Sequence, residues 1–100
     1  LTIRNYNEIA DIILNRNITF IAMQYPMRDV ESLRNILSRR SEMIFISNEK
    51  IFRDVLETEL YWEYFEDKFA IDFGHCTPKG KLLMAQNLSA VILEYLKSRP

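Results

Sequence analysis

Residues 18–24 read Ile-Thr-Phe-Ile-Ala-Met-Gln, and Tyr25-Pro26 follows them directly. A run that is apolar or β-branched at nearly every position is typical of a strand covered on both faces, as in a parallel sheet. Residues 43–46 form a second run of this kind. Because parallel strands need a crossover connection, the two runs predict an α/β fold with a short parallel sheet flanked by helices.

Helical periodicity surrounds both runs. Apolar residues recur at helical spacing from residue 3 to about residue 16, which predicts a first helix. Asp29 is a suitable N-cap for a second helix, and Ser47 or Asn48 is suitable for a third. Thr77 and Pro78 begin the last helix, which continues to about residue 97. Between the third and last helices, residues 60–74 are expected to form a long loop with no more than one short helical turn.

Composition limits the classes of function. One hundred residues suffice for one small α/β domain over residues 1–100. The 13 basic and 14 acidic residues nearly cancel, which argues against a nucleic-acid partner. Cys76 is the only cysteine, so an internal disulfide and a cysteine-cluster metal site are excluded. No apolar run is long enough for a membrane span. We expect neither a cofactor nor a metal, and the compartment stays open.

One segment carries residues that can transfer protons. Residues 72–80 read Asp-Phe-Gly-His-Cys-Thr-Pro-Lys-Gly, and His75 is the only histidine in the chain. In a tight loop, Asp72 can reach the imidazole Nδ1, which fixes the tautomer and stabilises the imidazolium formed when Nε2 takes a proton. Gly74 between them permits a backbone turn that a side chain would resist. The alternative is a capping carboxylate beside an exposed histidine without a catalytic role.

These residues resemble the last conserved block of the SGNH/GDSL hydrolases, an Asp-x-x-His followed by a small polar residue, a glycine and an amphipathic helix. Asp72, His75, Thr77 and Gly80 match that block. The two strand runs resemble the family's last two strands, and residues 64–69 resemble the loop ahead of the block. The resemblance implies the C-terminal part of a flavodoxin-like three-layer α/β/α sandwich, and the chain is then a fragment of a larger hydrolase domain.

The resemblance also implies a Ser-His-Asp ester hydrolase, in which His75 is general base and then general acid and Asp72 orients it. The family's Gly-Asp-Ser nucleophile and its oxyanion hole are absent from this sequence, whose first glycine is Gly74. Because loss of the serine alone removes about 10⁶-fold of kcat, we predict no esterase activity from these 100 residues in isolation. The implied partners are an ester substrate of the parent enzyme, and the rest of the hydrolase domain or a second copy of the chain at the open sheet edge.

A non-catalytic α/β interaction or oligomerisation module is the alternative function. In the hydrolase interpretation, an Asp72 oxygen lies about 2.6–3.2 Å from a His75 ring nitrogen. In the module interpretation, the two side chains point apart. Two other motifs are weaker. Ser47 and Lys50 match a Ser-x-x-Lys motif, but Ser47 fits better as a helix cap. Cys76 beside His75 suggests a thiol nucleophile, although adjacent side chains generally diverge.

The stretch over residues 57–67 is both acidic and aromatic. Its carboxylates do not have the spacing of a calcium loop, which favours a solvated face. Its aromatic side chains could line a substrate cleft, but covering the sheet is the simpler interpretation. The residues concerned are Glu57, Glu59, Glu63, Glu66 and Asp67 among the acids, and Tyr61, Trp62, Tyr64 and Phe65 among the aromatics.

Overall fold

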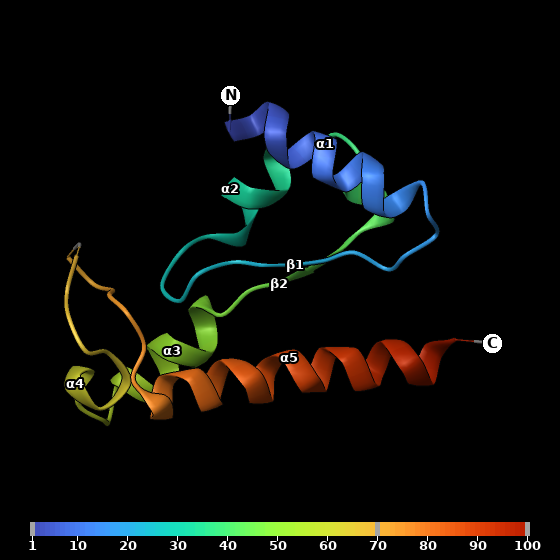
Figure 1. The fold of residues 1–100 in the computed structure, drawn as a ribbon. Coiled ribbons are helices and arrows are strands. Elements are labelled where there is room, and N and C mark those ends of the chain that lie inside the picture. Colours follow the sequence, from blue (N-terminus) through green and yellow to red (C-terminus); the bar gives the residue numbers. More distant parts are fainter. Residues whose placement is uncertain (1, 70, 100) are drawn as a thin grey trace. The chain divides into compact units, whose positions relative to one another are not determined.

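The computed structural model describes residues 2–69 and 71–99. Figure 1 shows the helices and strands formed by these residues. Their order is α1 (Thr2–Leu14), β1 (Ile21–Met23), α2 (Val30–Asn35), η1 (a 3₁₀ helix, Arg40–Glu42), β2 (Ile44–Ile46), α3 (Glu49–Leu56), α4 (Tyr61–Tyr64) and α5 (Pro78–Ser98). The chain divides into two compact units. The first contains residues 2–24 and 28–47, and the second contains residues 25–27 and 48–99.

The first unit contains the sheet. β1 and β2 pair in parallel, in register from Ile21 opposite Ile44 to Met23 opposite Ile46. One further bond, from Gln24 N to Ile46 O (2.9 Å), continues the ladder beyond the strands. The predicted α/β class and the parallel pairing are therefore confirmed. The strands are shorter than the apolar runs of the sequence, because each extends only as far as the other pairs with it.

Two helices of the first unit lie on the same side of the strands, as Figure 1 shows for α1 and α2. The side chain of Asn7 in α1 joins them by hydrogen bonds to the segment that follows α2. Its Nδ2 donates to Ile36 O (2.7 Å), and its Oδ1 accepts from Ser38 N (2.9 Å). A single amide thus satisfies main-chain groups at the end of α2, where helical partners run out.

The second unit has its core where α3, α4 and the start of α5 meet. Phe52 and Phe65 are fully buried, with ring centroids 5.5 Å apart. Tyr64 meets Phe52 edge-on at 6.1 Å, and Met27 and Cys76 complete the buried cluster. Tyr61, Tyr64 and Phe65 of the acidic stretch therefore pack into the helical core of their own unit.

The helix starts follow the expected chemistry in two cases of three. Asp29 caps α2 by accepting from the N–H two residues later, and Thr77 caps α5 by accepting from the N–H three residues later. Asn48 occupies the N-cap position of α3, but its side chain makes no cap bond. It is fully buried and accepts from Asn87 Nδ2 (2.8 Å) instead. Within the described residues, no helix is both long and apolar enough to cross a membrane.

Candidate functional site

The segment between α4 and α5 folds back on itself as a short antiparallel ladder. Phe65 and Cys76 form an isolated antiparallel bridge at its base. The two arms are joined by further main-chain bonds, from Thr77 N to Tyr64 O (3.0 Å), Glu66 N to His75 O (2.8 Å) and Phe69 N to Phe73 O (3.0 Å). Side chains that lie eight positions apart in the sequence therefore meet across this loop.

The contact across the loop that can take part in proton transfer joins the side chains of Asp67 and His75. The Asp67 Oδ2 atom lies 2.7 Å from His75 Nδ1, and its Oδ1 atom accepts from the His75 main-chain N–H, also at 2.7 Å. These bonds favour the ionised carboxylate, and they hold the pKa of Asp67 below its ordinary value. One carboxylate thus fixes both the backbone and the ring of the only histidine.

The imidazole is oriented but accessible. A carboxylate at Nδ1 selects the tautomer that carries its proton there, which leaves Nε2 as the acceptor. The His75 side chain is 58% exposed, and within residues 2–69 and 71–99 no bond to Nε2 is present. Phe69 lies edge-on to the ring, with centroids 4.5 Å apart at 79°. The arrangement can therefore accept a proton at Nε2 from an incoming group.

Asp67, and not Asp72, lies beside the Nδ1 atom of His75. An Asp72 oxygen lies 3.5 Å from Arg53 Nη2, and the same guanidinium contacts Glu49 at 3.1 Å. The Nδ1 contact that the hydrolase interpretation expected from Asp72 is made by Asp67 instead, and a catalytic role of Asp72 stays a prediction. The physical reason is the antiparallel course of the loop, which brings the carboxylate of the opposite arm to the imidazole.

Gly74 has a different role from the one expected. It does not adopt a positive φ, so it provides no left-handed turn. Instead, a Cβ at this position would lie 1.9 Å from Asp67 O and 2.5 Å from Asp67 Oδ1. The missing side chain lets the two arms of the loop approach closely enough for the Asp67–His75 bonds to form.

Asp67 is the functional candidate that the sequence did not single out. It was one of several acids in the stretch over residues 57–67, and nothing in its spacing from His75 marks it. The only available signal was the possibility that an aromatic stretch and the Asp-x-x-His segment pair as two arms of one loop. That pairing depends on tertiary bonds such as Glu66 N to His75 O, which no local pattern encodes.

The alternative nucleophiles are poorly placed. Cys76 is buried, its Sγ lies 3.7 Å from Met84 Sδ, and burial raises the pKa of its thiol. A reactive cysteine needs the opposite, a lowered pKa and access to solvent. In the Ser-x-x-Lys match, Lys50 pairs with Asp54 at 2.7 Å, one turn further along α3. Asn48, and not Ser47, occupies the N-cap of α3.

The acidic stretch does not form a metal site. Within the described part of the chain, no group of three or more His, Cys, Asp or Glu side chains is placed to hold an ion. Glu59, just before α4, and Glu63, within it, lie 2.8 Å and 3.7 Å from Lys79 Nζ at the start of α5. Of the aromatic residues beside them, Trp62 is 61% exposed.

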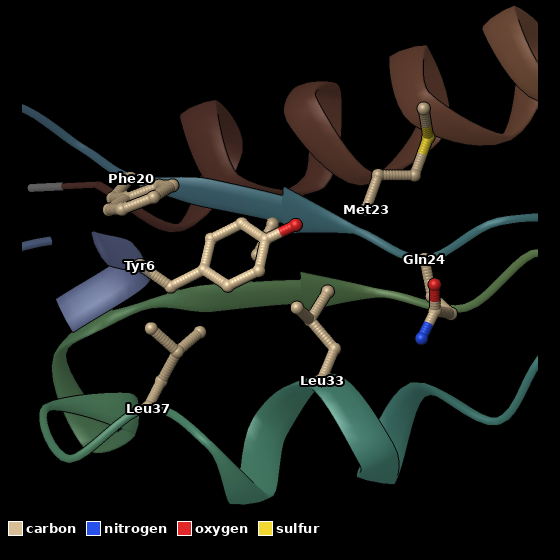
Figure 2. A pocket seen from close by; sticks show the side chains of 7 residues that line it. Tyr6, Phe20, Met23, Gln24, Leu33 and Leu37 are labelled. Atoms are coloured by element: carbon tan, nitrogen blue, oxygen red, sulfur yellow. The ribbon is translucent and has the colours of Figure 1, made fainter. Parts of the chain in front are cut away.

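A separate pocket of about 210 Å³ lies in the first unit. Figure 2 shows that Tyr6, Leu33 and Leu37 point into a common space beside β1, with Gln24 at one end. Apart from one phenol and one amide, the lining is apolar, so we assign the pocket no part in proton transfer. It is lined by Tyr6, Phe20, Ala22, Met23, Gln24, Leu33 and Leu37.

Comparison with the models of known protein families, with curated proteins and with solved structures found no match for this chain. The candidate site is therefore defined by its own chemistry. An exposed imidazole is bonded at Nδ1 by Asp67, in a loop held closed by main-chain bonds and followed by a capped helix. Such an arrangement can accept a proton at Nε2, which is the chemistry that a general base requires.

Proposed function

We propose that this chain is the C-terminal part of a serine ester hydrolase of the SGNH/GDSL type and supplies its general base, His75. The single observation that carries the proposal is the 2.7 Å contact between Asp67 Oδ2 and His75 Nδ1. The exposure of the ring and the absence of a bond to Nε2 in the described part of the chain support it. The flavodoxin-like arrangement of the whole domain belongs to the same proposal, and the parallel β1–β2 pair is its support.

In this mechanism, His75 Nε2 removes the hydroxyl proton of a serine while the serine oxygen attacks the ester carbonyl. The proton then passes from Nε2 to the departing alkoxide, which leaves as an alcohol. Water repeats the sequence on the acyl-serine, which releases the acid and restores the neutral imidazole. The carboxylate at Nδ1 stabilises the imidazolium in both halves. The serine and the oxyanion donors come from residues outside this sequence, which contains no Gly-Asp-Ser motif.

Two carboxylates compete for the orienting role in this proposal. The geometry favours Asp67, whereas the family resemblance favours Asp72, which lies against Arg53. Substitution by asparagine separates them, because it keeps the size of the side chain and removes the charge that stabilises the imidazolium. For an orienting carboxylate, we expect a loss of about 10⁴-fold in kcat. The other variant serves as the matched control, and we expect it to lose less than about tenfold.

The test uses the longest natural polypeptide that contains these 100 residues. Its turnover of a short-chain nitrophenyl ester is measured together with covalent labelling of serine by a fluorophosphonate. We expect both activities, and a loss of about 10³-fold or more for His75→Ala in a variant that keeps the circular dichroism of the original. A folded polypeptide that neither turns over the ester nor takes up the label would refute the proposal. Turnover that His75→Ala leaves intact would refute it equally.

A second candidate, an interaction or oligomerisation module, is favoured by the sheet edges. Phe20, Ala22 and Gln24 direct their main-chain groups toward β2, so those of Ile21 and Met23 point to the opposite edge. Among residues 2–69 and 71–99, no strand covers that edge. Uncovered edges are templates for another strand, and two short strands form a marginal sheet on their own.

The edge hypothesis is tested by the mass of the 100-residue chain in solution, measured by sedimentation over a range of concentrations. If copies of the chain pair through β1, the mass rises with concentration. Met23→Pro removes an N–H at the uncovered edge and should return the chain to a monomer. A chain that stays monomeric throughout excludes self-pairing, and it leaves the rest of a hydrolase domain as the only proposed partner for this edge.

A further inference from the structure

Tyr61, in the first turn of α4, reaches the candidate site through its hydroxyl. The Tyr61 OH donates to the main-chain carbonyl oxygen of Asp67 at 2.7 Å. This bond spans six positions of the chain and joins a helix to the arm of the loop that carries the orienting carboxylate. Its length is that of an ordinary, well-formed O–H···O hydrogen bond.

The phenol ring that carries this hydroxyl is held on several sides. It stacks on Phe65 with centroids 4.7 Å apart at 20°, and Phe65 is fully buried in the core of the unit. Trp62 meets the ring edge-on at 4.9 Å, and Lys68 Nζ lies 5.0 Å from its centroid. The donor to Asp67 is thus anchored to the core through Phe65.

Main-chain bonds from Glu66 N to His75 O and from Phe69 N to Phe73 O join the two arms on either side of Asp67, and the Tyr61 hydroxyl adds a bond at the carbonyl of Asp67 itself. Both carboxylate oxygens of Asp67 bond to His75, one to its main-chain N–H and one to Nδ1. Gly74 leaves the Asp67 backbone free to approach but does not hold it there. Burial and the nearby carboxylates raise the pKa of Tyr61, so its hydroxyl remains a protonated donor at neutral pH.

We propose that Tyr61 is a positioning residue that holds the Asp67 backbone at the distance where its carboxylate can bind His75 Nδ1. The consequence for catalysis rests on the proposed function, whereas the consequence for the imidazole tautomer rests on the geometry alone. The two can therefore fail separately.

The experiment uses the 100-residue chain, in which the single histidine gives one set of imidazole ¹⁵N resonances. The spectra are recorded where the imidazole ¹⁵N shifts no longer change with rising pH, so that the neutral ring is observed, and its two tautomers are distinguished by long-range ¹H–¹⁵N correlation. We expect the original chain to hold the proton mainly on Nδ1. Tyr61→Phe should lower the ratio of the Nδ1–H to the Nε2–H form at least about twofold, the smallest effect expected for one lost hydrogen bond.

Two further variants frame this result. Asp67→Ala removes the carboxylate, and we expect the largest fall in the ratio. Tyr64→Phe is the matched control, because it removes a hydroxyl from the same helix that bonds to Glu59 (2.8 Å) and not to the pair. A Tyr61→Phe ratio equal to that of the original chain would overturn the proposal. So would an equal fall in Tyr64→Phe, which would indicate general loosening of α4, or no fall in Asp67→Ala.

A measurement on the unaltered chain keeps the proposal testable even if Tyr61→Phe does not fold. A hydroxyl proton engaged in a 2.7 Å bond exchanges slowly with water, so we expect a resonance for the Tyr61 OH with a cross-peak to the Hα of Asp67. A hydroxyl that exchanges as fast as that of an exposed tyrosine would overturn the assignment. Ester turnover in the natural polypeptide enters neither measurement.

Discussion

Gly74→Ala tests directly whether the Asp67–His75 pair depends on close approach of the two loop arms. The added Cβ would lie 1.9 Å from Asp67 O, and real Cβ atoms keep at least 3.0 Å from such neighbours. The arms must therefore move apart by about 1.1 Å. The two Asp67–His75 bonds are 2.7 Å long, and a displacement of this size stretches them to about 3.8 Å, beyond the range of a hydrogen bond.

The clash also has a cost in stability, because the nearest atoms belong to the backbone of Asp67 and cannot rotate away. Overpacking of this kind typically costs about 1–3 kcal/mol. For a domain of this size, each kcal/mol lowers Tm by about 4–8 °C. We therefore expect Gly74→Ala to lower Tm by about 5–20 °C and to shift the His75 tautomer ratio toward that of Asp67→Ala.

The assay combines thermal unfolding, followed by circular dichroism, with the imidazole ¹⁵N spectrum. Ile71→Ala is the matched control, because it lies in the same loop and is 91% exposed, so its truncation should change neither quantity. If Gly74→Ala and Ile71→Ala have the same Tm and the same tautomer ratio, the arms are not packed as closely as the reasoning requires.

Three further outcomes are expected. Gly80→Ala should destabilise the chain in a urea titration, because the new Cβ would lie 2.3 Å from Tyr64 O. A glycine-to-alanine change inside a helix usually stabilises by about 1 kcal/mol, so a raised urea midpoint would contradict this prediction. Thr77→Ala should cost about 1 kcal/mol in the same titration through loss of its cap bond to Gly80 N (3.2 Å), and Thr77→Ser should restore most of it. The pKa of Asp67 is lowered in the folded chain, chiefly by its bond to the His75 ring, so its contribution is present above its unfolded pKa of about 3.9 and is lost as the pH falls further. The Tm of Asp67→Asn should consequently fall less steeply below about pH 4 than the Tm of the original chain. If the two Tm values fall equally in acid, the contact adds nothing to stability.

The features predicted well from the sequence are those determined by neighbouring residues. The start of α5 is an example, because Thr77 is a cap acceptor and Pro78 needs no donor in the first turn. Asp29 caps α2 for the same reason. The two strands were located by their apolar runs, but their lengths depend on each other. β1 ends at Met23 because β2 offers partners over only three residues.

The features that were missed depend on which segments come together. Asn48 has the chemistry of a cap, yet its side chain bonds to Asn87, 39 positions further along the chain, because Asn48 is fully buried and α5 brings the Asn87 amide within reach. The partner of His75 was missed in the same way. Sequence spacing pointed to the carboxylate nearest along the chain, Asp72. In the folded loop, the imidazole instead meets the carboxylate on the opposite arm, Asp67.

This exchange of carboxylates determines how much of the family resemblance survives. An Asp-x-x-His block explains catalysis only if its own aspartate orients the histidine, and here Asp72 contacts Arg53 while Asp67 contacts the ring. Asp67 also has its backbone held by Tyr61, and its approach is permitted by Gly74. The bonds to His75 and from Tyr61 therefore hold Asp67 beside the ring, whereas Asp72 lies against Arg53. If Asp72→Asn nevertheless proves the more damaging change in the natural polypeptide, the resemblance is the better guide, and the loop must adopt a different pairing there.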